Sequence, residues 1–336
     1  MNLRNHLRFA VIGCGRMGLR RMQSLVDNPR AELLWAVDVK DSARRTAAAR
    51  HGCDTAARPD EAINDPAVDG VVVSVPNKWH RDIVLSALRR KKHVFCEKPL
   101  GRDTAEARAM LAAAERSRVT LKVGSNLRYF PNVLKAKRLY DAGAVGRPLF
   151  LRSWIGHNGW TQDGWYAVPR LSGGGPLLDN GAHLFDLLRW FLGEPVDAFG
   201  AAQPLPDGRS RVEDNAMAVF HMKNGALASV HASWTQWAGY MRLELGGTRG
   251  ALRIENSGPR CETVLVARSG KEKVFDFSSQ SPNSYQAEMD DYLARLLRKE
   301  QPRASGWDGL RAVQMARAVY RSALTGRRVR IEAPPR

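Results

Sequence analysis

The chain has 336 residues, and its 52 Lys and Arg exceed its 34 Asp and Glu, which gives a formal net charge of +18. This length predicts two domains, each able to bury a core of its own. No apolar run reaches the eighteen or so residues of a membrane span, and the amino terminus enters a strand pattern too soon for a signal peptide, so we expect a cytoplasmic protein without a membrane partner.

The basic residues are spread along the whole chain, without a lysine-rich tail or an RNA-binding aromatic motif. This distribution argues against a nucleic-acid partner, although a positive field would attract anionic cofactors or substrates. The four cysteines, Cys14, Cys53, Cys96 and Cys261, form no C-x-x-C pair. They are expected to be reduced thiols rather than zinc ligands or disulfides.

The first predicted strand, "RFAVI" at residues 8–12, runs into "GCGRMG" and then into a helical pattern over residues 17–26. Gly13, Gly15 and Gly18 have the G-x-G-x-x-G spacing in the strand, turn and helix context that the motif requires. Gly13 permits the tight turn, Gly15 lets the backbone approach a pyrophosphate, and Gly18 lets helix and strand pack closely. Arg16 and Met17 lie in the same turn and are expected to contact the cofactor. A flexible turn without a ligand is the alternative.

The next predicted strand, "ELLWAVD", ends in Asp38, twenty residues after Gly18. A carboxylate at this place can bind the adenosine ribose hydroxyls, which makes dinucleotide binding the better interpretation. Asp38 would repel a 2′-phosphate, so the sequence predicts NAD rather than NADP. Lys40, Arg44 and Arg45 follow closely and could compensate for that repulsion.

Further strands are predicted at residues 70–75, 93–96 and 119–124, with helices at 79–90 and 104–117. This alternation predicts a parallel, doubly wound sheet of the Rossmann type. Ligands of such sheets bind at the carboxyl ends of the strands, where "SVPNKWH" and "EKPLG" both fall. Glu97 and Lys98 are therefore expected to face the cofactor crevice. The residues expected to contact the cofactor from the other segment are Ser74, Pro76, Asn77 and His80.

The pattern changes after residue 125, where a helix at 131–142 and a strand at 148–154 precede a loop at 156–175 that is rich in Gly and Trp. So long and aromatic a loop indicates a binding surface. A helix at 181–192 follows, and then strand patterns that include 215–222 and 226–234, joined by the hairpin signal Asn224-Gly225. The remaining predicted elements are helices at 284–299 and 307–324 and a possible last strand, "RRVRIE".

Asp179 and His183 are four residues apart, so they share a face if a helix begins near Asp179. The pair could instead be an N-cap aspartate and a core histidine satisfied by Asp186. A metal site is not expected, because two ligands lack a further His or Cys at a suitable spacing.

The motifs "VIGCGRMG", "VPNKWH", "EKPLG" and "GGGPLLDNGAHLFDLLRW" make the sequence resemble the Gfo/Idh/MocA family of nicotinamide-dependent oxidoreductases, over essentially the whole chain. The resemblance implies an α/β protein with a Rossmann domain at 1–124 and a substrate domain at 125–336. The second domain would contain a large, open, mainly antiparallel sheet that is often used for oligomer contacts, so we expect a homodimer or homotetramer.

The resemblance also places catalytic groups at Lys98, Asp179 and His183. A neutral imidazole can remove the hydroxyl proton while hydride leaves carbon, and a lysine ammonium can stabilise the alkoxide without a metal. Asp179 would orient the substrate or the imidazole, whereas Asp186 orients or packs. Candidates for substrate contact are Arg128, Asn158, Trp160, Trp165 and Tyr166, and the family's nicotinamide-side loop holds Asn77, Trp79 and His80. The chain departs from the family pattern at Tyr129, where a second Arg is common, and at Asn180, where an apolar residue is common.

The predicted function is hydride transfer between NAD(H) and a secondary alcohol or ketone of a sugar, a sugar derivative or a cyclic polyol. One alternative is an enzyme that retains NAD and oxidises its substrate only transiently, as in a glycosidase or epimerase type of reaction. Another is a non-catalytic regulator that binds a dinucleotide.

Overall fold

The computed structural model describes residues 6–159, 164–204, 211–280 and 283–333. Two compact units are present: Met1–Asn126 with Asn283–Leu310, and Leu127–Pro282 with Arg311–Arg336. The second segment of the first unit comes from near the carboxyl terminus, so this unit is discontinuous in sequence. The functional division after residue 124 stays a prediction.

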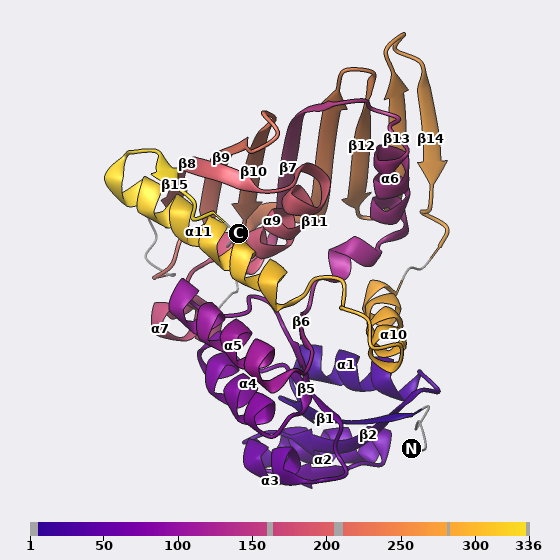
Figure 1. Ribbon diagram of the computed structural model, residues 1–336, viewed down its shortest axis with the longest axis vertical. Helices are drawn as coiled ribbons and strands as arrows, with labels where there is room; N and C mark the ends of the chain where they lie inside the picture. Colours follow the sequence, from indigo (N-terminus) through magenta and orange to yellow (C-terminus); the bar gives the residue numbers. More distant parts are fainter. Residues whose placement is uncertain (1–5, 160–163, 205–210, 281–282, 334–336) are drawn as a thin grey trace. The chain divides into compact units, whose positions relative to one another are not determined.

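The first unit contains a six-stranded sheet, of which Figure 1 labels β1, β2, β5 and β6. Its strand order is β3-β2-β1-β4-β5-β6, and every neighbouring pair in it is parallel. This order is that of a Rossmann fold, and the predicted doubly wound sheet is confirmed. The strands are β1 (Leu7–Ile12), β2 (Ala31–Val37), β3 (Asp54–Ala56), β4 (Gly70–Val73), β5 (His93–Cys96) and β6 (Leu121–Val123). The helices wholly within this unit are α1 (Arg16–Val26), α2 (Asp41–His51), α3 (Pro59–Asn64), the 3-10 helix η1 (Asn77–Trp79), α4 (His80–Arg89), α5 (Thr104–Ser117) and α10 (Ser284–Leu297).

Helix α10 completes the core of the first unit. Tyr292 on α10 packs against Phe9 of β1 and Phe95 of β5, with ring centroids 6.3 and 5.5 Å apart. Met289 and Leu293 of the same helix belong to the same buried cluster. A helix that begins 161 residues after the end of the last strand of this sheet, at Ser284 against Val123, therefore covers one of its faces.

The second unit is built on a nine-stranded sheet in the order β14-β13-β12-β11-β7-β10-β9-β8-β15. Only β10 and β7 run parallel among the neighbouring pairs, so the predicted mainly antiparallel sheet is confirmed. Its strands are β7 (Pro148–Asn158), β8 (Pro195–Gln203), β9 (Asn215–Met222), β10 (Leu227–Ser233), β11 (Thr235–Gly247), β12 (Gly250–Ser257), β13 (Arg260–Ala267), β14 (Glu272–Asp276) and β15 (Val329–Arg330). Its helices are α6 (Pro131–Asp141), η3 (Gly164–Ala167), α7 (Pro169–Ser172), α8 (Pro176–Asp179) and α9 (Gly181–Leu192), while η2 (Asn126–Tyr129) and α11 (Gly306–Thr325) cross the boundary between the units.

Burial alternates along β9, where Ala218 and Phe220 are buried and Met217, Val219 and His221 are exposed. One face of the strand thus packs into the core, and the other belongs to an open face of the sheet. Asn224-Gly225 joins β9 to the antiparallel β10 and Gly225 has a φ of +87°, so the predicted hairpin is confirmed.

The predicted loop at 156–175 is partly regular structure. β7 continues to Asn158 because that residue still pairs with Thr235 of β11. The short helices η3 and α7 follow, and Trp160 lies outside the described residues. A pattern search for long periodic runs cannot detect one-turn helices, which explains the difference.

Candidate active site

The glycine turn joins β1 to α1 at the carboxyl edge of the parallel sheet. Gly13 has a φ of +101°, and a Cβ atom there would lie 2.1 Å from the carbonyl oxygen of Ser74. A Cβ at Gly18 would lie 1.8 Å from the carbonyl oxygen of Gly13, so helix and strand approach too closely for any side chain. No atom lies within 4 Å of the corresponding position at Gly15, the N-cap of α1. The turn therefore leaves open space at a helix N-terminus, which fits the pyrophosphate of a dinucleotide.

Asp38 follows β2 directly and lies beside this turn. Its Oδ2 accepts a hydrogen bond from the backbone N–H of Cys14, and its Oδ1 accepts one from the backbone N–H of Lys40, both at 2.8 Å. The Arg44 side chain donates to the Asp38 carbonyl oxygen at 2.6 Å and pairs with Asp41. Asp38 thus has a structural task at the turn, and its carboxylate oxygens retain lone pairs for ribose hydroxyls.

The segment after β4 packs against the segment after β5 through His80. The ring of this buried histidine has Nδ1 at 3.0 Å from the carbonyl oxygen of Pro99 and Nε2 at 2.9 Å from that of Val75. Burial lowers the pKa of His80, although the two carbonyls oppose the shift. Asn77 is also buried, whereas Ser74 and Pro76 are partly exposed. The cofactor contacts predicted for these residues stay predictions, and His80 in addition joins the two segments.

Glu97 of the "EKPLG" motif belongs to a buried charged cluster. Its Oε1 accepts from Arg21 Nε at 2.6 Å, and Arg21 Nη2 pairs with Glu288 Oε2 at 2.8 Å. Lys122 Nζ donates to Glu288 Oε1 at 2.8 Å, and the backbone N–H of Ser125 donates to the same oxygen at 2.6 Å. The four side chains carry two positive and two negative charges, so the cluster is balanced. The predicted cofactor contact of Glu97 stays a prediction, and the structure gives its carboxylate a partner inside the first unit.

Lys98 is only partly buried, in contrast to Glu97. Lys98 lies in a bend after β5, between the buried residues Glu97 and Pro99, and it is the residue of this bend that solvent still reaches. Lys98 follows β5, on the same edge of the parallel sheet as the glycine turn after β1 and Asp38 after β2. It is therefore a cation near the end of the sheet where a dinucleotide would bind.

In the second unit, Asp179 is the last residue of α8, and His183 lies in the first turn of α9. The N-cap of α9 is Asn180, which makes no side-chain cap hydrogen bond, and Asp179 stands one residue before it. Leu177 and Leu178 are buried, as are most residues of α9, whereas Asp179 and His183 are both half-buried. The two polar side chains thus reach the accessible side of an otherwise apolar segment.

The other substrate candidates lie in the second unit in different environments. Arg128 is buried and pairs with Asp186 through Nε and Oδ2 at 2.7 Å, and the expectation that Asp186 orients or packs stays a prediction. Trp165 and Tyr166 are half-buried and stack with ring centroids 3.8 Å apart. Asn158 is exposed at the end of β7. The substrate contacts of these residues stay predictions.

Sequence reasoning missed Arg21, Lys122 and Glu288, because Lys122 and Glu288 are 166 residues apart and no motif contains them. Among the described residues, no group of three His, Cys, Asp or Glu side chains is placed to bind one metal ion. Across the same part of the chain, no helix has both the length and the apolar character needed to cross a bilayer.

The first unit has the strand order, the glycine turn and the acidic residue after β2 that define a dinucleotide-binding Rossmann domain. A sequence profile described as "Oxidoreductase family, NAD-binding Rossmann fold" matches residues 7–125, and the profile "GFO/IDH/MocA C-terminal domain" matches residues 133–253. The chain therefore belongs to the Gfo/Idh/MocA family and is an NAD-dependent oxidoreductase, which confirms the predicted family, enzyme class and cofactor.

Related proteins align over most of the chain. Myo-inositol 2-dehydrogenase of Thermotoga maritima is 31% identical, over 97% of this chain and 99% of that protein. The 1,5-anhydro-D-fructose reductase of Ensifer adhaerens is also 31% identical, over 81% and 83% of the two chains. Among solved structures, a levoglucosan dehydrogenase in complex with NADH matches with a TM-score of 0.89 over 97% of this chain and 99% of that one, at 22% identity, which supports the fold.

Proposed function

We propose that the protein transfers hydride between NAD and one secondary alcohol carbon of a cyclic polyol or ring-closed sugar. The observation that carries this proposal is the position of Lys98, which follows β5 on the sheet edge that also bears the glycine turn and Asp38. The relatives named for inositol and anhydrofructose support a ring-shaped substrate with neighbouring hydroxyls.

The residues that would hold the dinucleotide are those of the glycine turn and Asp38. The open position at Gly15 and the Asp38 carboxylate fit a pyrophosphate and a ribose without a 2′-phosphate. Bound NAD supplies the hydride acceptor or donor at its nicotinamide ring. Of the cations that follow Asp38, Arg44 donates to the Asp38 carbonyl oxygen and to Asp41, and Arg45 pairs with Asp41.

The protein groups handle the proton and the charge of the reaction. His183 takes the hydroxyl proton as a general base, which a neutral imidazole can do near neutral pH. The Lys98 ammonium stabilises the alkoxide as negative charge develops on oxygen. Asp179 orients the substrate hydroxyl or the imidazole. Trp165 and Tyr166 are the aromatic pair of the second unit that we assign to the substrate ring.

A panel of inositols, anhydrosugars and aldoses incubated with NAD tests the proposal. The expected result is one NADH formed per ketone or lactone product, measured by absorbance and by mass spectrometry. Product without net NADH would instead support an enzyme that oxidises its substrate only transiently. Tight NAD binding without turnover of any compound would support a dinucleotide-binding regulator.

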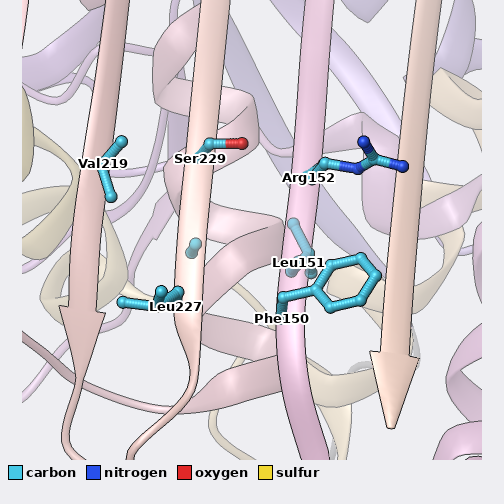
Figure 2. A pocket seen from close by; sticks show the side chains of 7 residues that line it. Phe150, Leu151, Arg152, Val219, Leu227 and Ser229 are labelled. Carbon is cyan, nitrogen blue, oxygen red and sulfur yellow. The ribbon is translucent and has the colours of Figure 1, made fainter.

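We also propose a homodimer or homotetramer that forms through the open face of the nine-stranded sheet. Phe199, Met217, Val219 and Leu227 are large apolar side chains on its strands that are 46–58% exposed. A groove of about 460 Å³ lies on this sheet, and Figure 2 shows side chains of β7, β9 and β10 that line it. Exposed apolar area of this kind commonly marks a protein contact. Light scattering of the wild type and of Val219→Glu should show an oligomer that the substitution weakens, and a monomeric wild type would refute the proposal.

A cytoplasmic location is proposed as well. Cys14, Cys53, Cys96 and Cys261 are all free thiols, as is usual in a reducing compartment. Cell fractionation would test this location, and recovery of the protein from an oxidising compartment would contradict it.

A further inference from the structure

The three consecutive glycines Gly173–Gly175 precede α8 and lie against residues that are distant in sequence. The carbonyl oxygen of Gly173 accepts a hydrogen bond from Arg317 Nη2 at 2.6 Å. A Cβ atom at Gly174 would lie 2.2 Å from the Tyr320 hydroxyl oxygen, and one at Gly175 would lie 1.9 Å from the Glu213 carbonyl oxygen. No side chain fits at either of these two positions, so the backbone is held close to Tyr320 and Glu213.

The Glu213 carboxylate accepts hydrogen bonds both from the backbone at the start of α8 and from the Tyr320 side chain. Its Oε2 accepts from the backbone N–H of Gly175 at 2.9 Å, and its Oε1 accepts from that of Leu177 at 3.1 Å. The hydroxyl of Tyr320, on α11, donates to the same Oε1 at 2.6 Å. Glu213 is only 8% exposed, so water cannot easily replace these three donors. Burial raises the pKa of Glu213, although the three hydrogen bonds oppose the shift.

Backbone hydrogen bonds connect this anchor to Asp179 and His183. The N–H of Asp179 donates to the carbonyl oxygen of Gly175 at 3.0 Å, and the N–H of His183 donates to that of Asn180 at 3.1 Å. Helix α8 has four residues, which is too short to be stable without tertiary support. The position of Gly175 therefore sets the position of Asp179 and, through the next turn, that of His183.

We propose that Glu213, held by Tyr320, is a positioning residue for the hydride transfer reaction, because it fixes the Gly173–Gly175 turn that places Asp179 and His183. This proposal rests on the catalytic roles proposed above for those two residues. Glu213 itself touches neither substrate nor cofactor in this scheme. Small displacements of reacting groups reduce turnover strongly, so loss of the anchor should lower kcat more than it lowers NAD binding.

The test compares Glu213→Gln, Tyr320→Phe and the control Glu194→Gln. Glu194 is a partly buried carboxylate of the same unit that accepts from Arg311 and from Arg189, which lies in the last turn of α9 whereas His183 lies in its first turn. Single-turnover hydride transfer, NAD affinity by fluorescence and the melting temperature are measured on each preparation. Glu213→Gln is expected to lower the hydride transfer rate by roughly 10- to 100-fold at wild-type NAD affinity. Tyr320→Phe should give a smaller loss, and Glu194→Gln should lose thermal stability without losing rate.

The double variant separates one shared anchor from two independent effects. If Tyr320 acts only by holding Glu213, the two substitutions should not act independently. The double variant Glu213→Gln/Tyr320→Phe should then keep a larger fraction of the wild-type rate than the product of the fractions kept by the two single variants. A folded Glu213→Gln protein with a wild-type rate would overturn the proposal, as would an equal rate loss in Glu194→Gln at equal loss of stability. If Glu213→Gln does not fold, a wild-type rate in Tyr320→Phe overturns it.

Two further variants distinguish this inference from the proposed function. Asp179→Asn and His183→Asn should both lose turnover while they retain NAD binding. If they lose turnover and Glu213→Gln does not, only the positioning role fails. If they retain turnover, the catalytic assignment fails and the positioning role fails with it.

Discussion

Replacement of Glu288 by Gln is expected to destabilise the first unit strongly. Glu288 is completely buried and pairs with two cations, Arg21 and Lys122, each at 2.8 Å. The substitution removes one of two negative charges and leaves the cluster of Arg21, Lys122 and Glu97 with a net charge of +1 in the core. Removal of one partner from a buried ion pair costs about 3–5 kcal/mol. For a unit of this size that corresponds to a fall of roughly 6–20 °C in melting temperature.

Urea denaturation and thermal melting measure this effect, with Glu300→Gln as a control. Glu300 pairs with Arg295 and Arg298 on the surface of the same unit, so its replacement should change stability little. The double variant Glu288→Met/Lys122→Met removes one charge of each sign and should be more stable than Glu288→Met alone. A free energy of unfolding for Glu288→Gln within about 1 kcal/mol of wild type would refute this account of the cluster.

The same cluster predicts a dependence of stability on acid pH. Burial by itself would raise the pKa of Glu288. The positive charges of Lys122 and Arg21 lower this pKa by more than burial raises it, so the folded pKa lies below the ordinary value. The stabilisation is therefore fully present above the ordinary glutamate pKa of about 4.3 and is lost as pH falls through the folded pKa. The free energy of unfolding should therefore fall less steeply at acid pH in Glu288→Gln than in wild type. An unchanged pH dependence would mean that Glu288 does not contribute to it.

The remaining predictions concern the candidate active site. Lys98→Met should lower single-turnover hydride transfer by roughly 10²–10⁴ while NAD affinity by fluorescence changes little, and near-normal transfer would remove Lys98 from the chemistry. Asp38→Ala should raise the Kd for NAD and lower the preference for NAD over NADP, measured by titration with both cofactors. An equal loss for both would mean that Asp38 only supports the turn through Cys14. His183→Asn should abolish the fall of the oxidation rate that the wild type shows as pH decreases. If the residual activity of this variant still falls at low pH, another group causes the fall.

Much of the local structure follows from sequence pattern alone. The glycine spacing and the alternation of apolar runs predict β1, α1 and β2 closely, because these elements depend on contacts between near neighbours in the chain. Helix α5 at Thr104–Ser117 and helix α9 at Gly181–Leu192 have the predicted bounds. The short apolar strands β4 and β5 are equally clear, since both of their faces are buried, whereas the sequence pattern does not indicate β3 at Asp54–Ala56, which is mostly exposed.

The candidate site was predictable only where a motif carries its own structural context. Gly13, Gly18 and Asp38 lie where the sequence indicates, because strand, turn and helix follow one another directly. For "EKPLG" the sequence predicts a site at the end of β5, but it does not distinguish the environments of Glu97 and Lys98. Their difference depends on Arg21, which lies 76 residues before Glu97.

Sequence by itself determined the parallel sheet and the dinucleotide turn, because both are written in local spacing, whereas the large antiparallel sheet and the residues for proton and hydride chemistry followed from the resemblance to a family. Only the tertiary structure decided that α10 completes the core of the first unit, that Glu288 balances the charges around Glu97, and that Glu213 and Tyr320 hold the turn before Asp179. These contacts join residues from 36 positions apart, as in Leu177 and Glu213, to 283 apart, as in Phe9 and Tyr292, and such partners meet only after the chain has folded around them.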